Sequence, residues 1–288
     1  MQIPFGRSGV RSTGMIGLAQ RAGRLAIART HGAGWTGCDR ELDFEGLRAC
    51  VRQHRLRRAQ THLVLDRQSF RLLPTEAPDV PAAELNEAVR WQIADLVDFD
   101  ITDAVVDHCP MGDSNRHDGK HMIYAVAARQ DAVRDAIHQV RRAGLRVHQV
   151  GIPELALRNL ASHLTQPGQG IALLYAEADG ATVVLVRDGR LFVTRRVEVQ
   201  LNNEGGNPLD SVLLEIQRAL DYFDGHFAHS PIRQLAVMGD DPVEDEAVQY
   251  LGGSLRMEAR WVPLDSIAPG SGGPGCAFAT GASLGVDG

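Results

Sequence analysis

Two long segments of the chain repeat apolar residues at the 3.6-residue spacing of an α-helix. In segment 84–98 the apolar stripe consists of Leu85, Ala88, Val89, Ile93, Leu96 and Val97. In segment 207–227 it consists of Leu209, Val212, Leu213, Ile216, Leu220, Phe223 and Phe227. Both stripes predict helices that pack on sheets of the same chain. Trp91 lies outside the first stripe, so we expect its ring to contact something other than that core.

Glycines mark the turns of two predicted hairpins. Gly23 separates one pair of short apolar runs and Gly180 separates another, and glycine accepts the positive φ that a tight hairpin turn requires. A third strand follows the turn at Asp188-Gly189. The strands expected from these runs are 15–19, 25–28, 171–175, 181–186 and 191–197. The recurrence of the hairpin indicates a weak internal duplication.

The remaining apolar patterns predict an α/β chain of two lobes. Further helices are expected at 42–58, 131–143, 153–162, 243–251 and 276–284. Further strands are expected at 61–66, 104–109, 121–127, 234–238 and 257–262. A Pro/Gly linker at 166–170 divides a first lobe, 15–165, from a second lobe, 166–288. Residues 79–150 of the first lobe, approximately, are expected to form an inserted α/β subdomain.

Size and charge narrow the possible functions. A chain of 288 residues and 31.3 kDa is longer than the usual single domain, in agreement with two lobes. Its net charge of −6 and pI near 6.0 provide no general attraction for phosphate backbones, so we expect no nucleic-acid partner. One basic cluster stands out, made of Arg48, Arg52, Arg55, Arg57 and Arg58. It is interpreted as a solvated face, with contact to an acidic partner or a membrane surface as the alternative.

The sequence offers no recognisable catalytic or metal-binding motif. The four cysteines are scattered without a CxxC pair, which indicates a reducing compartment and no zinc site. His117 and His121 have helical metal-ligand spacing, but the intervening Asp118-Gly119 predicts a turn, so no metal site is expected. No catalytic residue is assigned. Neither 1–14 nor any other segment is apolar over a membrane-spanning length, which predicts a soluble, cytoplasmic protein.

Three stretches resemble a known family. They are 88–100 with its continuation 103–107, the segment 212–223, and the turn Arg187-Asp-Gly-Arg190. These stretches are similar to PilM-type pilus assembly proteins, and most closely to the MshI-like branch of the mannose-sensitive haemagglutinin (MSHA) pilus. The resemblance extends from residue 15 to about residue 285. It implies an actin-like, ribonuclease H-like duplicated, two-lobed ATPase fold with an inserted α/β subdomain in the first half.

The resemblance also implies partners. Such a protein is a cytoplasmic assembly adaptor that binds the cytoplasmic tail of a bitopic PilN-like inner-membrane protein, and thereby contacts the pilus assembly motor complex. It is peripheral to the inner membrane through this partner, and homo-oligomers are possible. A groove walled by the inserted subdomain would suit an extended tail. Trp91 is a candidate partner-binding residue, with simple packing against the subdomain as the alternative.

Actin-like proteins bind nucleotide phosphates between two hairpin loops, each with an Asp-x-Gly, and this chain departs from that pattern. The first loop has no aspartate but has Arg21 and Arg24, whereas the second has Glu177 with Asp179 displaced. We therefore expect no ATPase activity, because phosphoryl transfer depends on a positioned metal. Residual binding of ATP and Mg²⁺ would use the positions Gly17, Gly180, Thr182 and Gly239. The alternatives are an actin-like small-molecule kinase and a nucleotide-controlled switch.

Overall fold

The first lobe is built on a four-stranded sheet. The computed structural model describes residues 15–29, 42–112, 121–198, 208–269 and 275–285. The sheet has the strand order β2-β1-β3-β7. Its strands are β1 (Ile16–Arg21), β2 (Arg24–Arg29), β3 (Gln60–Val64) and β7 (Arg146–Gly151), and its helices are α1 (Phe44–Gln53) and α3 (Gln130–Arg142). The predicted first hairpin is confirmed, and its turn has a positive φ at both Ala22 (45°) and Gly23 (76°), as a type I′ turn requires.

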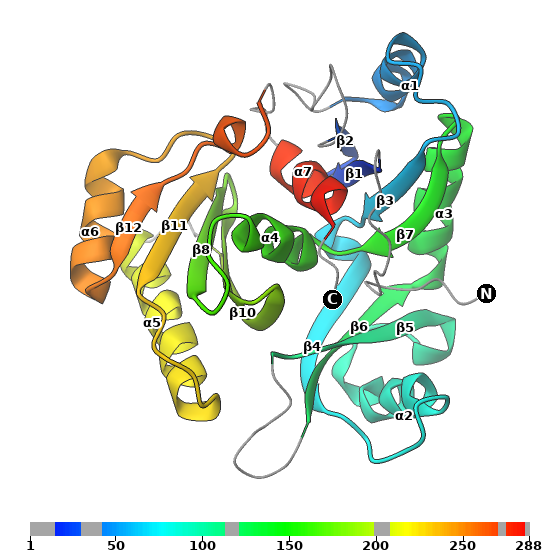
Figure 1. The fold of residues 1–288 in the computed structure, drawn as a ribbon. Helices are drawn as coiled ribbons and strands as arrows, with labels where there is room; N and C mark the ends of the chain where they lie inside the picture. The colour runs from blue at the N-terminus through cyan, green and yellow to red at the C-terminus, as the bar shows by residue number, and fades with distance from the viewer. Residues whose placement is uncertain (1–14, 30–41, 113–120, 199–207, 270–274, 286–288) are drawn as a thin grey trace.

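The second lobe repeats the hairpin at the start of a five-stranded sheet. Its strand order is β10-β9-β8-β11-β12 (Figure 1). The strands are β8 (Gly170–Glu177), β9 (Gly180–Arg187), β10 (Arg190–Glu198), β11 (Gln234–Gly239) and β12 (Glu258–Trp261), and the helices are α5 (Pro208–His226) and α6 (Asp245–Leu255). The antiparallel meander β8-β9-β10 and the parallel addition of β11 agree with the sequence pattern.

A three-stranded sheet forms the subdomain. It has the order β4-β6-β5, with β4 at Phe70–Glu76, β5 at Ala104–Pro110 and β6 at Met122–Arg129. Successive side chains of a strand point to opposite faces, and β6 uses both. Ile123, Ala125 and Ala127 pack with helix α2 (Leu85–Gln92) in a small separate core. Tyr124 and Val126, on the other face, join the main core of the molecule. The subdomain is therefore attached through one face of its sheet and covered by α2 on the other.

Two buried helices lie between the larger sheets. Figure 1 shows α4 (Pro153–Ser162) and α7 (Cys276–Leu284) in the middle of the molecule, side by side. Most residues of α4 and nearly all of α7 are buried. Gly17 of β1 allows this packing, because a Cβ there would lie 1.8 Å from the carbonyl oxygen of Ala279. Helix α7 thus closes against the first lobe although it ends the second half of the sequence.

Two predicted helices are shorter in the structure. Helix α2 ends at Gln92, and a 3-10 turn, Ala94–Leu96, replaces the rest of the predicted segment 84–98. The prediction that Leu96 faces the core was therefore wrong, since its side chain is 60% exposed. Helix α1 ends at Gln53 because the chain turns at Arg55, which has a positive φ. Among the described residues, no helix combines the length and apolar character needed to cross a membrane.

Candidate functional site

The ends of the two hairpins meet between the lobes, where three arginines and three carboxylates form ion pairs. The arginines are Arg21, Arg67 and Arg196, and the carboxylates are Glu154, Glu177 and Asp240. We call these six residues the arginine–carboxylate network. They come from the ends of β1, β3, β8 and β11, from β10, and from the first turn of α4. The network therefore joins elements of both lobes.

Arg67 is the centre of the network. It follows β3 in a 3-10 turn that Asp66 caps, so its side chain leaves the first lobe at the carboxyl end of a buried strand. One terminal nitrogen donates to Glu154 Oε1 at 2.5 Å, and the other donates to Thr182 Oγ1 at 2.9 Å and lies 3.4 Å from Glu177 Oε2. Glu154 also lies at the positive end of the α4 dipole. A single guanidinium thus links the connecting helix to the second hairpin.

Arg21 and Arg196 extend the network on either side of Glu177. Arg21, at the first hairpin turn, donates to Asp240 and lies 3.9 Å from Glu177 Oε1. Arg196 of β10 donates to Glu177 Oε2 at 3.0 Å and to the exposed Asp179 at 3.0 Å. Glu177 is only 4% exposed, yet all three arginines lie within ion-pair distance of it. Its charge is compensated entirely by these side chains.

Two groups besides Arg21 donate hydrogen bonds to the carboxylate of Asp240. It follows β11, and its Oδ1 accepts hydrogen bonds from the hydroxyl of Tyr175 at 2.7 Å and from the backbone N–H of Gly275 at 3.1 Å. Burial, and secondarily the charge of Asp240, raise the pKa of Tyr175 well above its usual value. Tyr175 therefore stays a hydrogen-bond donor throughout the physiological range. The carboxylate in turn ties the start of α7 to the second lobe.

The positive and negative charges of the network balance, so its ion pairs serve to hold elements of the fold together. Buried ion pairs are stable only when each charge has a partner, and here three buried carboxylates face three arginines. A phosphate in this place would be drawn to the arginines but would have to break their existing pairs. A Mg²⁺ ion would need carboxylates that are now held by guanidinium groups. Two buried atoms, Arg67 Nε and Glu154 Oε2, have no hydrogen-bond partner in the structure.

Three of the four predicted nucleotide positions lie at the network. Thr182 is fully buried and accepts from Arg67, Gly180 follows Asp179 in the second hairpin turn, and Gly239 immediately precedes Asp240. Gly17 does not join them. It lies four residues before Arg21 along β1, about 13 Å at the rise of a strand, and faces α7. Nucleotide binding by these four positions stays a prediction.

Sequence reasoning noticed Arg21 and Glu177 but missed the residues that complete the network. Arg67 and Asp240 carry a usable signal, because each comes within a few residues of the end of a buried strand. The carboxyl ends of strands are where open α/β sheets place their sites. Glu154, in contrast, looks like an ordinary first-turn acid, and Arg196 looks like an outward residue of a strand. Their partners, Arg67 and Glu177, lie 87 and 19 residues away in the sequence, so no local pattern predicts these pairs.

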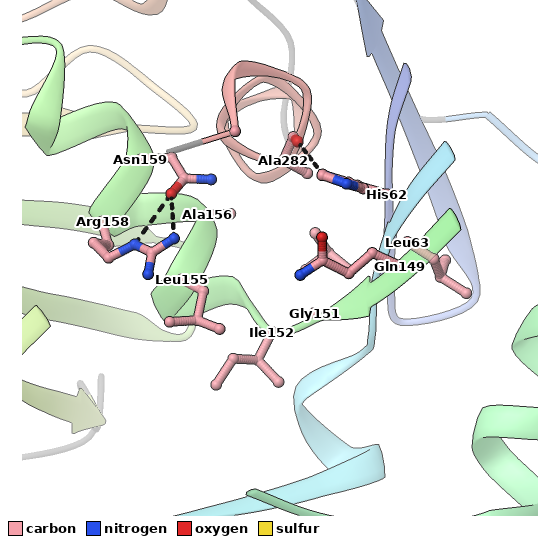
Figure 2. A pocket seen from close by; sticks show the side chains of 12 residues that line it. His62, Leu63, Gln149, Gly151, Ile152, Leu155, Ala156, Arg158, Asn159 and Ala282 are labelled. Atoms are coloured by element: carbon pink, nitrogen blue, oxygen red, sulfur yellow. Dashed lines mark hydrogen bonds between the residues drawn. The ribbon is translucent and has the colours of Figure 1, made fainter. Parts of the chain in front are cut away.

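A small cavity lies between α4 and the C-terminal end of α7. It has a volume of about 40 Å³, room for about one water, and its walls come from β3, β7, α4 and α7. Figure 2 shows His62 directed at the backbone of Ala282 and Arg158 directed at Asn159. His62 Nδ1 lies 2.8 Å from the Ala282 carbonyl oxygen, and Asn159 accepts from Arg158 at 2.8 and 3.1 Å. The cavity is too small for a nucleotide, and its polar groups hold the two helices in place.

The candidate partner residue Trp91 lies far from either site, on the outer side of the subdomain. Its side chain is 58% exposed, and the indole N–H donates to Glu87 Oε1 at 2.8 Å. The expectation that it lies off the core stripe is confirmed. His117, half of the histidine pair considered above, lies outside the described residues. Within the described part of the chain, no three His, Cys, Asp or Glu residues are grouped as metal ligands would be.

Comparison with solved structures identifies the fold. The structure is similar to the PilM–PilN type IV pilus biogenesis complex, with a TM-score of 0.70 and 18% identity over 96% of this chain and 98% of that chain. It is also similar to the cytoplasmic domain of EpsL, an inner-membrane component of the type II secretion system of Vibrio cholerae. There the TM-score is 0.54, with 11% identity over 94% of both chains. No protein-family model matches the sequence, and the search of curated proteins found no match. With its two hairpin-bearing lobes, inserted subdomain and paired connecting helices, the chain has the actin-like fold predicted from its sequence.

Proposed function

We propose that this chain is a cytoplasmic assembly adaptor of a type IV pilus machine, which binds the cytoplasmic tail of a PilN-like bitopic inner-membrane protein. The likeness to the PilM–PilN complex carries this proposal, because it extends over nearly the whole of both chains and includes the subdomain. The likeness to the EpsL domain supports a role at the inner membrane. Through its partner the protein would be peripheral to that membrane and would contact the assembly motor. The resemblance of 88–107 and 212–223 favours an MSHA-type pilus.

The tail is proposed to bind where the subdomain meets the first lobe. A hollow of about 410 Å³ lies there, between the turn that precedes β5 and the start of α3. It is lined by Phe99, Asp100, Asp103, Arg129, Gln130, Asp131 and Arg134. Phe99 provides an apolar contact and the charged side chains provide selectivity, which is the combination that suits recognition of a short peptide.

The adaptor is proposed to act without hydrolysing ATP. The support is the arginine–carboxylate network, which fills the place between the hairpin turns with the protein's own charges. Hydrolysis needs a metal ion that neutralises the developing charge, and Glu177 and Asp240 are held by arginines instead. A nucleotide-controlled switch is the second candidate, because three predicted nucleotide positions lie at the network. A small-molecule kinase is disfavoured by the same ion pairs.

Calorimetry tests the proposal directly. The purified protein is titrated with a synthetic peptide of the PilN-like tail from the same organism, with and without Mg-ATP. Equal affinity in both titrations is the expected result, and binding that requires Mg-ATP would establish the switch instead. Absence of binding in both would reject the adaptor.

A pair of variants locates the tail. Phe99→Ala is expected to weaken tail binding about ten-fold. Phe44→Ala removes the same ring from another partly exposed position, on α1, where the Arg142 guanidinium of α3 lies over it. This variant should leave tail binding unchanged. If the two variants bind the peptide equally, the hollow beside α3 is not the tail site.

A further inference from the structure

The subdomain carries most of the large apolar side chains that are exposed in the described part of the chain. Five large apolar residues of the described chain are exposed, namely Val80, Trp91, Leu96, Leu214 and Tyr250. Three of the five fall within residues 80–96. Trp91 and Leu96 are the most exposed, at 58% and 60%. Isolated exposed leucines are normal, but a tryptophan and a leucine five residues apart are more typical of an interaction site.

The backbone explains why these side chains face outward. Val89 and Ile93 are fully buried against the sheet, so the opposite side of α2 faces solvent. The helix then ends at Gln92, and the 3-10 turn Ala94–Leu96 turns Leu96 away from the core. The hydrogen bond from the Trp91 indole to Glu87 holds the ring on the surface. The tryptophan is therefore oriented before any partner arrives.

Acidic residues share this side of the helix with Trp91. Glu84, Glu87 and Trp91 follow one another at intervals of three and four residues, which places them in one row along α2, and Asp95 lies in the 3-10 turn after the helix. We call these four residues, with Leu96, the acidic ridge. Around it, residues 76–103 hold eight acidic side chains and one basic one, Arg90, so this segment has a net charge of −7. The whole chain has −6, so the residues outside this segment together have a net charge of +1.

Much of this charge is uncompensated within the chain. All eight acidic residues are exposed, and two of them form ion pairs, Asp98 with Arg71 and Glu87 with Arg90. The carboxylates of Asp79, Glu84, Asp95 and Asp103 make no ion pair or hydrogen bond with any residue that the structure describes. Two of these four, Glu84 and Asp95, belong to the acidic ridge, so their charge is available to a basic partner.

We propose that the acidic ridge is a docking surface for a basic amphipathic segment of a partner protein. The lysines or arginines of that segment would pair with Glu84 and Asp95, while its apolar side would cover Trp91 and Leu96. Charge complementarity selects this occupant, because opposite potentials across an interface favour encounter and register. Membrane surfaces and nucleic acids are anionic and would be repelled by the same charges. None of the ridge residues lines the proposed tail site, and the proposal does not involve nucleotide.

The direct test measures binding of a defined probe. The probe is a fluorescein-labelled amphipathic Leu/Lys peptide of about 18 residues, long enough for several helical turns, and the reference probe replaces every lysine with glutamate. Fluorescence anisotropy should show that the full-length protein binds the Leu/Lys peptide, with an affinity that falls as salt is added. The Leu/Glu peptide should not bind. Binding of both peptides, or of neither, would overturn the proposal.

A matched pair of double variants locates the binding. Leu96→Ala/Asp95→Asn removes one exposed leucine and one exposed carboxylate from the ridge. Leu214→Ala/Asp221→Asn removes the same chemistry from α5 of the second lobe. The ridge variant should bind the Leu/Lys peptide about ten-fold more weakly, and the α5 variant should bind as the unaltered protein does. Equal binding by the two variants would mean that the peptide is held non-specifically.

Two further measurements exclude a purely electrostatic attraction and a lipid surface as the explanation of binding. Trp91→Ala keeps every charge of the ridge and should also weaken binding, whereas a purely electrostatic attraction would leave it unchanged and would refute an apolar contact. Flotation with vesicles of phosphatidylglycerol and phosphatidylethanolamine should leave the protein unbound. Binding to these vesicles that the ridge substitutions abolish would replace the protein partner by a lipid surface and overturn the proposal.

Discussion

The arginine–carboxylate network and the acidic ridge hold similar numbers of acidic side chains, but the negative charge is neutralised by arginines in the first and exposed to solvent in the second. In the network every buried carboxylate lies against an arginine, and pairs such as Arg21–Asp240 and Arg67–Glu177 join one lobe to the other. On the ridge the three carboxylates are exposed, and two of them, Glu84 and Asp95, have no basic partner among the described residues. The first arrangement uses charge to hold this chain together. The second leaves charge available to another molecule.

The difference shows why position matters more than composition for an acidic residue. A buried carboxylate without a partner would destabilise the fold by several kcal/mol, so its arginine is part of the structure. An exposed carboxylate is already stabilised by water, and a surface ion pair contributes only about 0–1 kcal/mol. Substitutions in the network should therefore change stability, and those on the ridge should change binding.

The largest effect is expected for Arg67→Ala. This change leaves Glu154 without its arginine and removes one of the three that surround Glu177, so we expect a loss of about 3–5 kcal/mol in the free energy of unfolding. Urea denaturation measures it. Arg71→Ala is the matched control, because its 2.7 Å pair with Asp98 is exposed and should contribute no more than about 1 kcal/mol. Equal losses in the two variants would refute the structural role of the network.

A smaller loss is expected for Gly17→Ala, which tests the packing of β1 against α7. The added Cβ would overlap the Ala279 carbonyl, so α7 must shift, at a cost of about 1–3 kcal/mol. In Gly253→Ala, on α6, the added methyl meets nothing within 4 Å and the helix should gain about 0.5–1 kcal/mol. Thermal unfolding distinguishes the two. A tolerated Gly17→Ala would show that α7 is held less tightly than its contacts indicate.

A pH-dependent effect is expected from His62 beside α7. Burial lowers its pKa below the ordinary 6.5, and the hydrogen bond to Ala282 offsets this only in part. Above that pH the ring is neutral in both states and stability is unaffected. As pH falls below 6.5 the unfolded chain takes up the proton first, so the folded state loses stability progressively.

Unfolding temperatures at neutral and mildly acidic pH measure this effect. His62→Gln, which removes the titrating group, should lose less stability on acidification than the unaltered protein. His138→Gln, at an exposed position on α3, should lose as much as the unaltered protein. If all three proteins respond alike, His62 does not titrate in this range.

The sequence predicted the elements that repeat a clear local pattern and missed those that depend on distant partners. The hairpins, α4 and α7 agree closely with their apolar runs and turn glycines. Strand β4 was missed because Pro74 lies within it, and proline is usually confined to edge strands, which β4 is. The arginine–carboxylate network was missed for a similar reason, because its pairs join residues that are distant in the sequence. Arg67 and Glu154 are 87 residues apart, and no local pattern pairs them.

The outward position of Trp91 was easier to predict than the outward position of its neighbour Leu96. Trp91 stands out because it breaks the apolar stripe of its own helix, a property of local spacing alone. The outward turn of Leu96 was not foreseen, because the stripe continues at helical spacing past the point where the helix ends at Gln92. Periodicity shows which side of a helix is apolar, but it does not show where tertiary packing ends the helix.

The smallest effect on stability is expected from the ridge variant Leu96→Ala/Asp95→Asn. Leu96 is exposed and Asp95 makes no ion pair with the described residues, so the free energy of unfolding should change by less than about 0.5 kcal/mol. The buried Leu47→Ala on α1 provides the contrast, because removing a fully buried leucine costs about 2–5 kcal/mol. If the ridge variant lost more than about 1 kcal/mol, the ridge would stabilise the subdomain itself, and weaker peptide binding by that variant would no longer identify a docking surface. Retained stability together with lost binding is the combination that separates a surface kept for a partner from one kept for the fold.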